Sequence, residues 1–220
     1  MPRVRLAANF AIVFARAAGL VAPVFVLAAT AGFLAPAARA QTPSFTLMGW
    51  PSDGGPNGSS RVNALSADGR SATGSTFSAA VVGAPGYLWT ADGGRNDFGR
   101  AAELPRGTVG QGISGDGLTV VGAAGPDGTT PTHAFTWSQA SGYRDLGLLP
   151  GYNQSSAVDA NHDGSVVLVN MDNGSGSVHQ GFRWTASGGM QGIGAGTTPL
   201  EISGDGSTIV GVTGDRKSVV

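Results

Sequence analysis

Residues 112–122 read Gly-Ile-Ser-Gly-Asp-Gly-Leu-Thr-Val-Val-Gly, and residues 202–211 repeat the stretch almost unchanged as Ile-Ser-Gly-Asp-Gly-Ser-Thr-Ile-Val-Gly. Looser copies occupy residues 65–74 and 160–169. An Asp-Gly pair favours the positive backbone angles of a tight hairpin turn, so each copy predicts a strand, a turn and a second strand. A motif that recurs in this way indicates architecture rather than a single reactive site.

Three landmarks keep a constant register along the chain. The Asp-Gly pairs begin at positions 68, 116, 163 and 205, in steps of 48, 47 and 42 residues. A tryptophan follows each of the first three pairs after 21 residues, and a glycine follows each tryptophan after ten. This register predicts a set of structural repeat residues: Asp68, Gly69, Trp89, Asp116, Gly117, Trp137, Asp163, Gly164, Trp184, Asp205 and Gly206.

The second copy shows what one repeat unit contains. A strand ends at Ile113, and residues 118–121 form a β-branched strand that Gly122 is expected to close. Residues 133–137 alternate, which places His133, Phe135 and Trp137 on one face of a third strand. Residues 143–147 supply a fourth strand. Four short antiparallel strands in a unit of this length are typical of one propeller blade.

The sequence therefore predicts an all-β fold built of four-stranded antiparallel units and resembling a β-propeller. A closed propeller needs about four blades, whereas the chain supplies three units and a fragment, so the ring is expected to be incomplete. Edge strands at its open ends would be exposed to pairing. A β-solenoid is the alternative, although its coils take roughly 20–30 residues, about half of this period.

The second unit carries three motifs that together resemble a known family. They are Ile-Ser-x-Asp-Gly-x-x-Val-Val-Gly from Ile113, His-Ala-Phe-x-Trp from His133, and Asp-Leu-Gly-x-Leu-Pro-Gly from Asp145. This combination resembles the HAF extracellular repeat family of bacteria, over residues 62–214. The resemblance implies an exported repeat protein, in some cases attached to an autotransporter barrel or a sorting tail, and it implies no common enzymatic activity. The other units depart from the pattern, with Pro85 and Gln180 at the position of His133.

The N-terminus has the features of a cleaved export signal. Arg3 and Arg5 form a basic start, an apolar run follows from Gly19 to Pro36, and Ala-Arg-Ala precedes Gln41. An uncleaved membrane anchor is the alternative, because the run approaches the ~20 residues that span a bilayer. The chain has no cysteine, so disulfides and thiolate metal sites are excluded. The protein is expected to be secreted, periplasmic or on the cell surface of a bacterium.

Removal of residues 1–40 makes the mature chain acidic. The segment carries four of the thirteen basic residues and none of the fourteen acidic ones, which leaves a net charge of −5. This balance argues against a nucleic-acid partner, because nucleic acid requires basic patches. No other segment is expected to span a membrane as a helix.

The predicted organisation of the chain follows from the repeat limits. Residues 1–40 are the signal peptide, and residues 41–61 are a linker with a strand at residues 45–50, which is expected to complete a blade begun at the other end. Residues 62–214 form the repeat domain, in units at 62–109, 110–156, 157–200 and, in part, 201–214. Residues 215–220 match no part of the repeat and resemble translated adapter sequence, so they are predicted to be a non-native tail on a fragment of a longer protein.

One set of side chains has the spacing of a metal-binding loop. Asp159, Asn161 and Asp163 place oxygen atoms on alternate residues ahead of a glycine, as in the first half of a calcium loop. The twelfth position is Asn170 rather than glutamate, and the alternative is a hairpin turn whose aspartate binds its own backbone. Calcium is thus the one cofactor that the sequence suggests. The three histidines lack ligand spacing, and His133 is expected to form a hydrogen bond within its blade.

No catalytic residue is predicted. The serines of the repeat belong to turns rather than to a nucleophile elbow, and Asp97 and Asp145 occupy strand ends. The three repeat tryptophans could stack on sugars, but their regular register favours a core layer shared by the blades. The predicted function is a non-enzymatic surface or extracellular module that binds or displays, with a glycan or a surface protein as the partner. A secreted polysaccharide-active enzyme or a carbohydrate-binding module is the alternative.

Overall fold

The computed structural model describes residues 59–77, 85–98, 107–125, 132–174, 179–214 and 218–219. The chain divides into two units, Met1–Phe45 and Thr46–Val220, and every described residue belongs to the second. The strand expected at residues 45–50 and the signal peptide lie outside the described residues. Within the part that is described, there is no helix with the length and apolar character that crossing a membrane requires.

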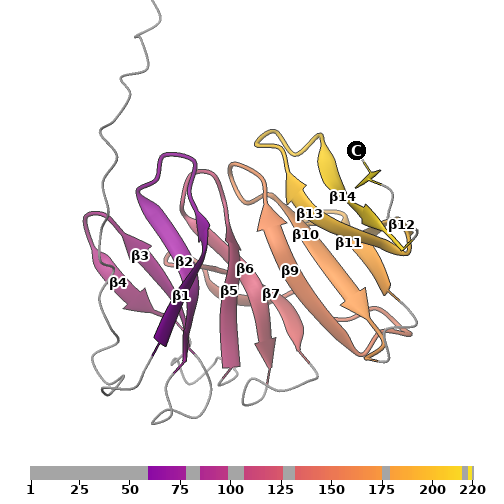
Figure 1. Cartoon of the computed structure of the whole chain (residues 1–220), viewed down its shortest axis with the longest axis horizontal. Helices are drawn as coiled ribbons and strands as arrows, with labels where there is room; N and C mark the ends of the chain where they lie inside the picture. The colour runs from indigo at the N-terminus through magenta and orange to yellow at the C-terminus, as the bar shows by residue number, and fades with distance from the viewer. Residues whose placement is uncertain are drawn as a thin grey trace, which may run out of the picture. The chain divides into compact units, whose positions relative to one another are not determined.

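The described residues form four antiparallel sheets in which the strands pair in chain order (Figure 1). The first sheet contains β1 (Ser59–Leu65), β2 (Ser71–Phe77), β3 (Gly86–Thr90) and β4 (Gly94–Asp97). The second contains β5 (Gly107–Ile113), β6 (Thr119–Gly125), β7 (His133–Ser138) and β8 (Gly142–Asp145). The third contains β9 (Gln154–Ala160), β10 (Val166–Asp172), β11 (His179–Thr185) and β12 (Gly189–Ala195). The fourth contains β13 (Thr197–Ile202), β14 (Ile209–Thr213) and β15 (Ser218–Val219).

Successive sheets lie side by side, and the first strand of each sheet contacts the sheet before it. The predicted all-β, propeller-like fold of four-stranded antiparallel units is therefore confirmed. The β-solenoid alternative is wrong, because its coils stack strands in parallel whereas every pairing here is antiparallel. Each sheet begins before the predicted unit limit, which falls inside β1, β5, β9 or β13. The reason is that the Asp-Gly motif follows the first strand of each sheet, so its spacing does not mark where that strand begins.

Two details of the second unit differ from expectation. Strand β6 begins at Thr119 rather than Leu118, because the Leu118 amide donates to the Asp116 carboxylate instead of joining the sheet. The strand also continues beyond Gly122 to Gly125. In the fourth sheet, Val219 pairs with Gly211 and Ser218 pairs with Val212, so part of the predicted tail forms a third strand. Strand pairing uses backbone groups, which any sequence supplies. The pairing therefore does not test whether the tail is native, and its origin stays a prediction.

The first strand of every sheet carries a bulge at the same repeat position. The pairing shifts register between Val62 and Ala64 in β1, between Gly110 and Gly112 in β5, and between Pro199 and Glu201 in β13. In the third sheet Asp159 and Ala157 of β9 pair with the adjacent residues Leu168 and Val169 of β10, so the extra residue again lies in the first strand. A bulge inserts one unpaired residue and increases the local twist. The repeated bulge is therefore part of the blade, although the sequence pattern gave no sign of it.

Hydrophobic side chains fill the spaces between the sheets. One cluster includes Phe98, Val120 and Phe135, which come from the first and second sheets. A second cluster includes Val121, Val167 and Trp184 from the second and third sheets. Adjacent residues of β6 thus enter different clusters, and the second sheet is buried on both faces. This explains why β6, Thr-Val-Val-Gly-Ala-Ala-Gly, is apolar without strict alternation.

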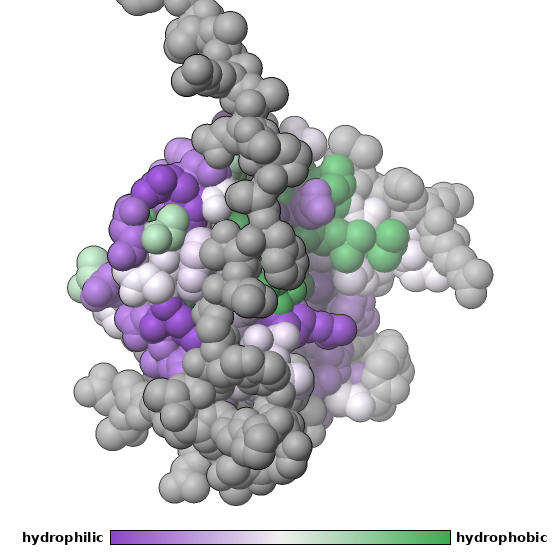
Figure 2. Space-filling view, turned by 60° about the vertical axis from the view of Figure 1, so that its left-hand side comes forward, coloured by the Kyte–Doolittle hydropathy of each residue, from purple (hydrophilic) through white to green (hydrophobic). Residues whose placement is uncertain are grey.

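The sheets at the two ends have more exposed apolar surface. Large hydrophobic side chains with an exposed fraction above a third include Val62 and Leu65 in β1 and Leu200, Val210 and Val212 in β13 and β14. Figure 2 shows the side of the first sheet, where hydrophilic residues cover much of the described surface and hydrophobic residues gather in a few groups.

Candidate functional site

The Asp-Gly motif forms a closed hydrogen-bonded turn, as the second sheet shows. Ser114 Oγ donates to Asp116 Oδ1 at 2.6 Å, and the Leu118 amide donates to the same oxygen at 3.0 Å. The Thr119 amide in turn donates to Ser114 Oγ at 2.9 Å. Gly117 has a φ of +74°, a conformation that favours glycine. The aspartate is therefore committed to the turn between β5 and β6.

The same turn is present in all four sheets. The carboxylates of Asp68 and Asp205 accept from a serine two residues before them and from the amide two residues after them. In the third sheet Asn161 replaces that serine, and Ser165 donates both its amide and its hydroxyl to Asp163. These hydrogen bonds favour the charged carboxylate and so lower its pKa. The largest cause is the Arg70 amide for the pKa of Asp68 and the Ser165 hydroxyl for the pKa of Asp163. The Ser203 hydroxyl is the largest cause that lowers the pKa of Asp205 to about 2.

Backbone hydrogen bonds join each of these turns to the turn of the next sheet. The Ala67 amide donates to the Gly115 carbonyl at 3.0 Å, the Asp116 amide to the His162 carbonyl at 2.8 Å, and the His162 amide to the Gly204 carbonyl at 2.9 Å. Each acceptor is the residue that precedes the aspartate of the next motif. The motif thus connects the sheets as well as turning the chain within each one.

Two of the three repeat tryptophans, Trp137 and Trp184, lie between sheets. Trp137 stacks on Phe98 of the first sheet with ring centroids 4.8 Å apart. Arg144 of the second sheet lies over the Trp184 ring at 4.9 Å, and Trp184 is only 8% exposed. Trp89 is half-buried in β3. For Trp137 and Trp184, a contact with another residue of the chain thus covers one face of the ring.

The predicted calcium ligands point to separate backbone partners. Asp159 accepts from the Ala160 amide through Oδ1 and from the Ile202 amide through Oδ2, both at 2.8 Å. Asn161 Oδ1 accepts from the Val166 amide, and Asp163 Oδ1 accepts from Ser165. Burial raises the pKa of Asp159, which carries a structural bond to the fourth sheet. Among the described residues no group of three or more His, Cys, Asp or Glu side chains could hold a metal ion, and the calcium site stays a prediction.

The histidines take part in local hydrogen bonds. His133 Nδ1 lies 2.8 Å from Asp145 Oδ2 across the β7–β8 hairpin, which confirms the expected bond within the blade. His179 Nε2 lies 2.7 Å from Thr198 Oγ1. Asp97, the counterpart of Asp145 in the first sheet, accepts from Arg95 at 2.7 Å.

A groove of about 820 Å³ lies between the second and third sheets, at their Asp-Gly turns. Eight of its lining residues carry hydroxyl groups, namely Thr119, Thr136, Ser138, Ser141, Tyr143, Ser165, Thr185 and Ser187. The lining includes two arginines, Arg144 and Arg183, and contains no carboxylate or imidazole side chain. The groove can thus offer hydrogen bonds and positive charge, and it has no acid–base pair.

The alternation of the strands decides which arginine faces into this groove. Trp184 belongs to the cluster between the second and third sheets, so its neighbour Arg183 points to the opposite face of β11. Arg144 reaches across from β8 and lies over the Trp184 ring. Arg144 is exposed, and among the described residues it forms no salt bridge. The sequence analysis did not predict a role for Arg144, because residues of two repeat units form the groove and no motif within a single unit marks it.

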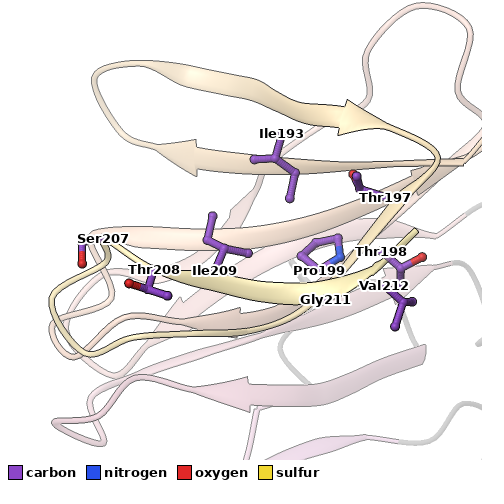
Figure 3. Close-up of a pocket in the computed structure, with 9 residues that line it drawn as sticks. All are labelled: Ile193, Thr197, Thr198, Pro199, Ser207, Thr208, Ile209, Gly211 and Val212. Atoms are coloured by element: carbon purple, nitrogen blue, oxygen red, sulfur yellow. The ribbon is translucent and has the colours of Figure 1, made fainter. Parts of the chain in front are cut away.

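A smaller hollow of about 430 Å³ lies where the third sheet meets the fourth. Figure 3 shows Ile193 of β12 pointing toward Ile209 and Pro199 of the fourth sheet. The remaining lining residues are Thr197, Thr198, Ser207, Thr208, Gly211 and Val212. This hollow is more apolar in its side chains than the groove and contains no charged residue.

Comparisons with known proteins give distant similarities in structure alone. No family model matches the chain, and no curated protein sequence matches it. The structure is similar to TolB from Acinetobacter baumannii, with 16% identity and a TM-score of 0.48 over 70% of this chain and 38% of that one. It is also similar to a protein described as TolB from Agrobacterium tumefaciens, with 20% identity and a TM-score of 0.49 over 68% of this chain and 52% of that one. A third is prolyl oligopeptidase B from Galerina marginata, with 9% identity, a TM-score of 0.44 and coverage of 68% and 25%.

The chain thus spans about half or less of the length of these three proteins. At such identities and scores the likeness carries no statement about function. The four sheets themselves define the architecture as a propeller-like row of antiparallel repeat units.

Proposed function

We propose that the protein is an exported, non-enzymatic binding module of the HAF repeat type, acting in the periplasm, in the extracellular space or at the cell surface. The predicted export signal at residues 1–40 and the three repeat motifs of the second unit support this proposal. The repeated turns, the bonds between them and the apolar clusters serve as a scaffold. The ligand then binds to surfaces between the units.

The groove between the second and third sheets is the observation that carries the proposal. Its eight hydroxyl-bearing residues offer donors and acceptors to a polyhydroxylated ligand, and Arg144 offers a cation without a carboxylate partner among the described residues. A groove of this size lies within the range of ligand sites, about 300–1,000 Å³. We infer that the ligand is a glycan that carries acidic groups, for which a guanidinium is the suitable partner.

Replacement of Arg144 tests this proposal. The purified protein is titrated by calorimetry with an oligogalacturonate and with a neutral cello-oligosaccharide of the same length. We expect the acidic glycan to bind and Arg144→Gln to weaken it roughly tenfold, because a hydrogen bond to a charged group contributes about 1.5–3 kcal/mol. Arg61→Gln is the matched control, since Arg61 is exposed like Arg144 but lies in β1, outside the groove, and its replacement is expected to leave binding unchanged.

The outcome is decisive in either direction. The proposed ligand class would be wrong if neither glycan bound, if both bound equally, or if the two arginine variants weakened binding to the same extent. Unfolding in urea shows whether each variant keeps the stability of the parent protein, so a loss of binding can be assigned to the groove.

A further inference from the structure

Phe98 and Leu146 occupy the same place in consecutive sheets. Each residue follows the fourth strand of its sheet, and one repeat of 48 residues separates them. The Phe98 amide donates to the Gly86 carbonyl at 3.1 Å, and the Leu146 amide donates to the Ala134 carbonyl at 2.9 Å. Gly86 and Ala134 are themselves one repeat apart, in β3 and β7. The two side chains therefore start from equivalent positions of the backbone.

Each of these positions faces a tryptophan on the third strand of the next sheet. Phe98 stacks on Trp137 with ring centroids 4.8 Å apart and an angle of 22° between the ring planes. Trp184 holds the corresponding position in the third sheet, and Leu146 packs against the hydrophobic cluster that contains it. Leucine has no ring to stack on the indole. There the guanidinium of Arg144 lies over the ring instead, 4.9 Å from its centroid.

The counterpart of Arg144 in the first sheet is Asn96. Arg144 of β8 pairs with Thr136 of β7, and Asn96 of β4 pairs with Leu88 of β3 in the same register. Both residues are exposed. The asparagine carries no charge and is much shorter than arginine. The first sheet thus presents asparagine and phenylalanine to the next sheet, where the second sheet presents arginine and leucine.

A phenylalanine and an arginine at these positions compete for one face of the tryptophan. Both groups reach the ring from the preceding sheet, so they meet it on the same side. Stacking of an aromatic ring and attraction of a cation both use the face of the indole. A face that a phenylalanine ring covers cannot also hold a guanidinium.

We propose that Leu146 is a positioning residue of the groove between the second and third sheets. Its side chain leaves the face of Trp184 to the Arg144 guanidinium, and this contact holds the cation at the groove where an acidic glycan binds. A cation that is already fixed loses less conformational freedom when it binds a carboxylate. The role of Leu146 rests on the proposed function and deepens it, because it explains what directs the charge into the groove.

The NMR signal of the Arg144 Nε–H group reports the contact in the absence of any ligand. The ring current of an indole shifts protons above its face upfield, and Arg144→Gln identifies the signal by removing it. We expect an upfield signal in the parent protein and in Leu146→Met, which keeps a ringless side chain of similar volume. In Leu146→Phe we expect the signal at the position of an exposed arginine such as Arg61, because the new ring displaces the guanidinium.

Calorimetry with oligogalacturonate then tests whether the contact serves the ligand. We expect Leu146→Phe to weaken binding roughly tenfold, as Arg144→Gln does, and Leu146→Met to keep the parent affinity. The converse change, Asn96→Arg combined with Phe98→Leu, replaces the large ring by a smaller side chain and does not crowd the first interface. It is expected to add a second upfield arginine signal, from a guanidinium over Trp137.

Several results would overturn the role of Leu146. They are an Arg144 signal in the parent protein at the position of Arg61, an upfield signal that persists in Leu146→Phe, or an equal loss in Leu146→Met. Unchanged glycan binding in Leu146→Phe would do the same, because the contact would then not serve the groove. If Leu146→Phe did not fold, absence of a second upfield signal in the double variant would decide against the role.

The proposed function fails separately from this role. A parent protein that binds no oligogalacturonate, and whose Arg144 signal responds to the Leu146 variants as expected, would overturn the glycan groove. The control of the Arg144 position by Leu146 would then still stand.

Discussion

Phe135→Ala is expected to destabilise the protein by about 3–5 kcal/mol, as truncation of a buried aromatic residue does. Phe135 is fully buried, contacts Phe98 of the first sheet and lies 5.5 Å from the Tyr143 ring of its own. Its removal would leave a cavity in the cluster between two sheets, which rigid strands fill poorly. The measurement is the free energy of unfolding in urea, followed by tryptophan fluorescence.

Leu118→Ala is the control for this variant. Leu118 is also a large hydrophobic residue of the second unit, but it is 66% exposed in the turn before β6. We expect its replacement to change the free energy of unfolding by less than about 0.5 kcal/mol. Equal effects of the two substitutions would contradict the assignment of Phe135 to a core between sheets.

Gly122→Ala is expected to cost about 1–3 kcal/mol or more, because it adds an atom where backbone already lies. A Cβ on Gly122 would stand 1.9 Å from the Val109 carbonyl oxygen of β5. Gly74 and Gly211 occupy the same repeat position and would place a Cβ 1.8 Å from the Arg61 oxygen and 2.3 Å from the Thr198 oxygen. The repeated glycine thus permits the first two strands of these sheets to approach closely.

The third sheet shows how the chain can tolerate a side chain at this position. It carries Val169 there, fully buried and paired with Ala157. The Cβ of a real valine cannot lie 1.9 Å from a carbonyl oxygen, the distance that a Cβ on Gly122 would have. The backbone of β9 must therefore lie farther from Val169 than the backbone of β5 lies from Gly122. Gly122→Ala would force the second sheet toward a similar adjustment.

Gly142→Ala separates this close approach from the ordinary effect of losing a glycine. Gly142 has a φ of +70° and open space around the added atom, so its replacement meets backbone strain alone. We expect a cost of about 1–2 kcal/mol, the usual penalty of a left-handed conformation. Urea unfolding that ranked Gly142→Ala as the more damaging variant would contradict the close packing of β5 and β6.

Much of the fold could be predicted from the sequence, because the decisive information repeats. The Asp-Gly turns, the strand that carries Phe135 and Trp137, and the bond of His133 within its blade all follow from local pattern and spacing. Turn chemistry and strand alternation act over a few residues, so one sequence contains them fully. The fourfold register then joins the local elements into one architecture.

The contacts between units could not be predicted in this way. The bulges in the first strands leave no sign in composition, and the amide of Asp116 finds its acceptor at His162, in the next unit. Arg144 lies over Trp184 only because two sheets stand side by side. Asp159 was predicted to belong to a calcium loop, but its carboxylate accepts from the Ile202 amide of the next unit. A pattern within one unit cannot show a contact of this kind.

The central claim is that the Asp-Gly motif joins the sheets of a propeller-like row and has no reactive role. Amide hydrogen exchange, measured by NMR at single residues, tests it most directly. We predict that the turn amides of Ala67, Asp116 and His162 exchange as slowly as the Val120 amide of the central strand β6, since each donates to a carbonyl of the next sheet. Exchange of these three amides as fast as that of Gly93, which donates to an exposed Thr90 hydroxyl, would contradict the account.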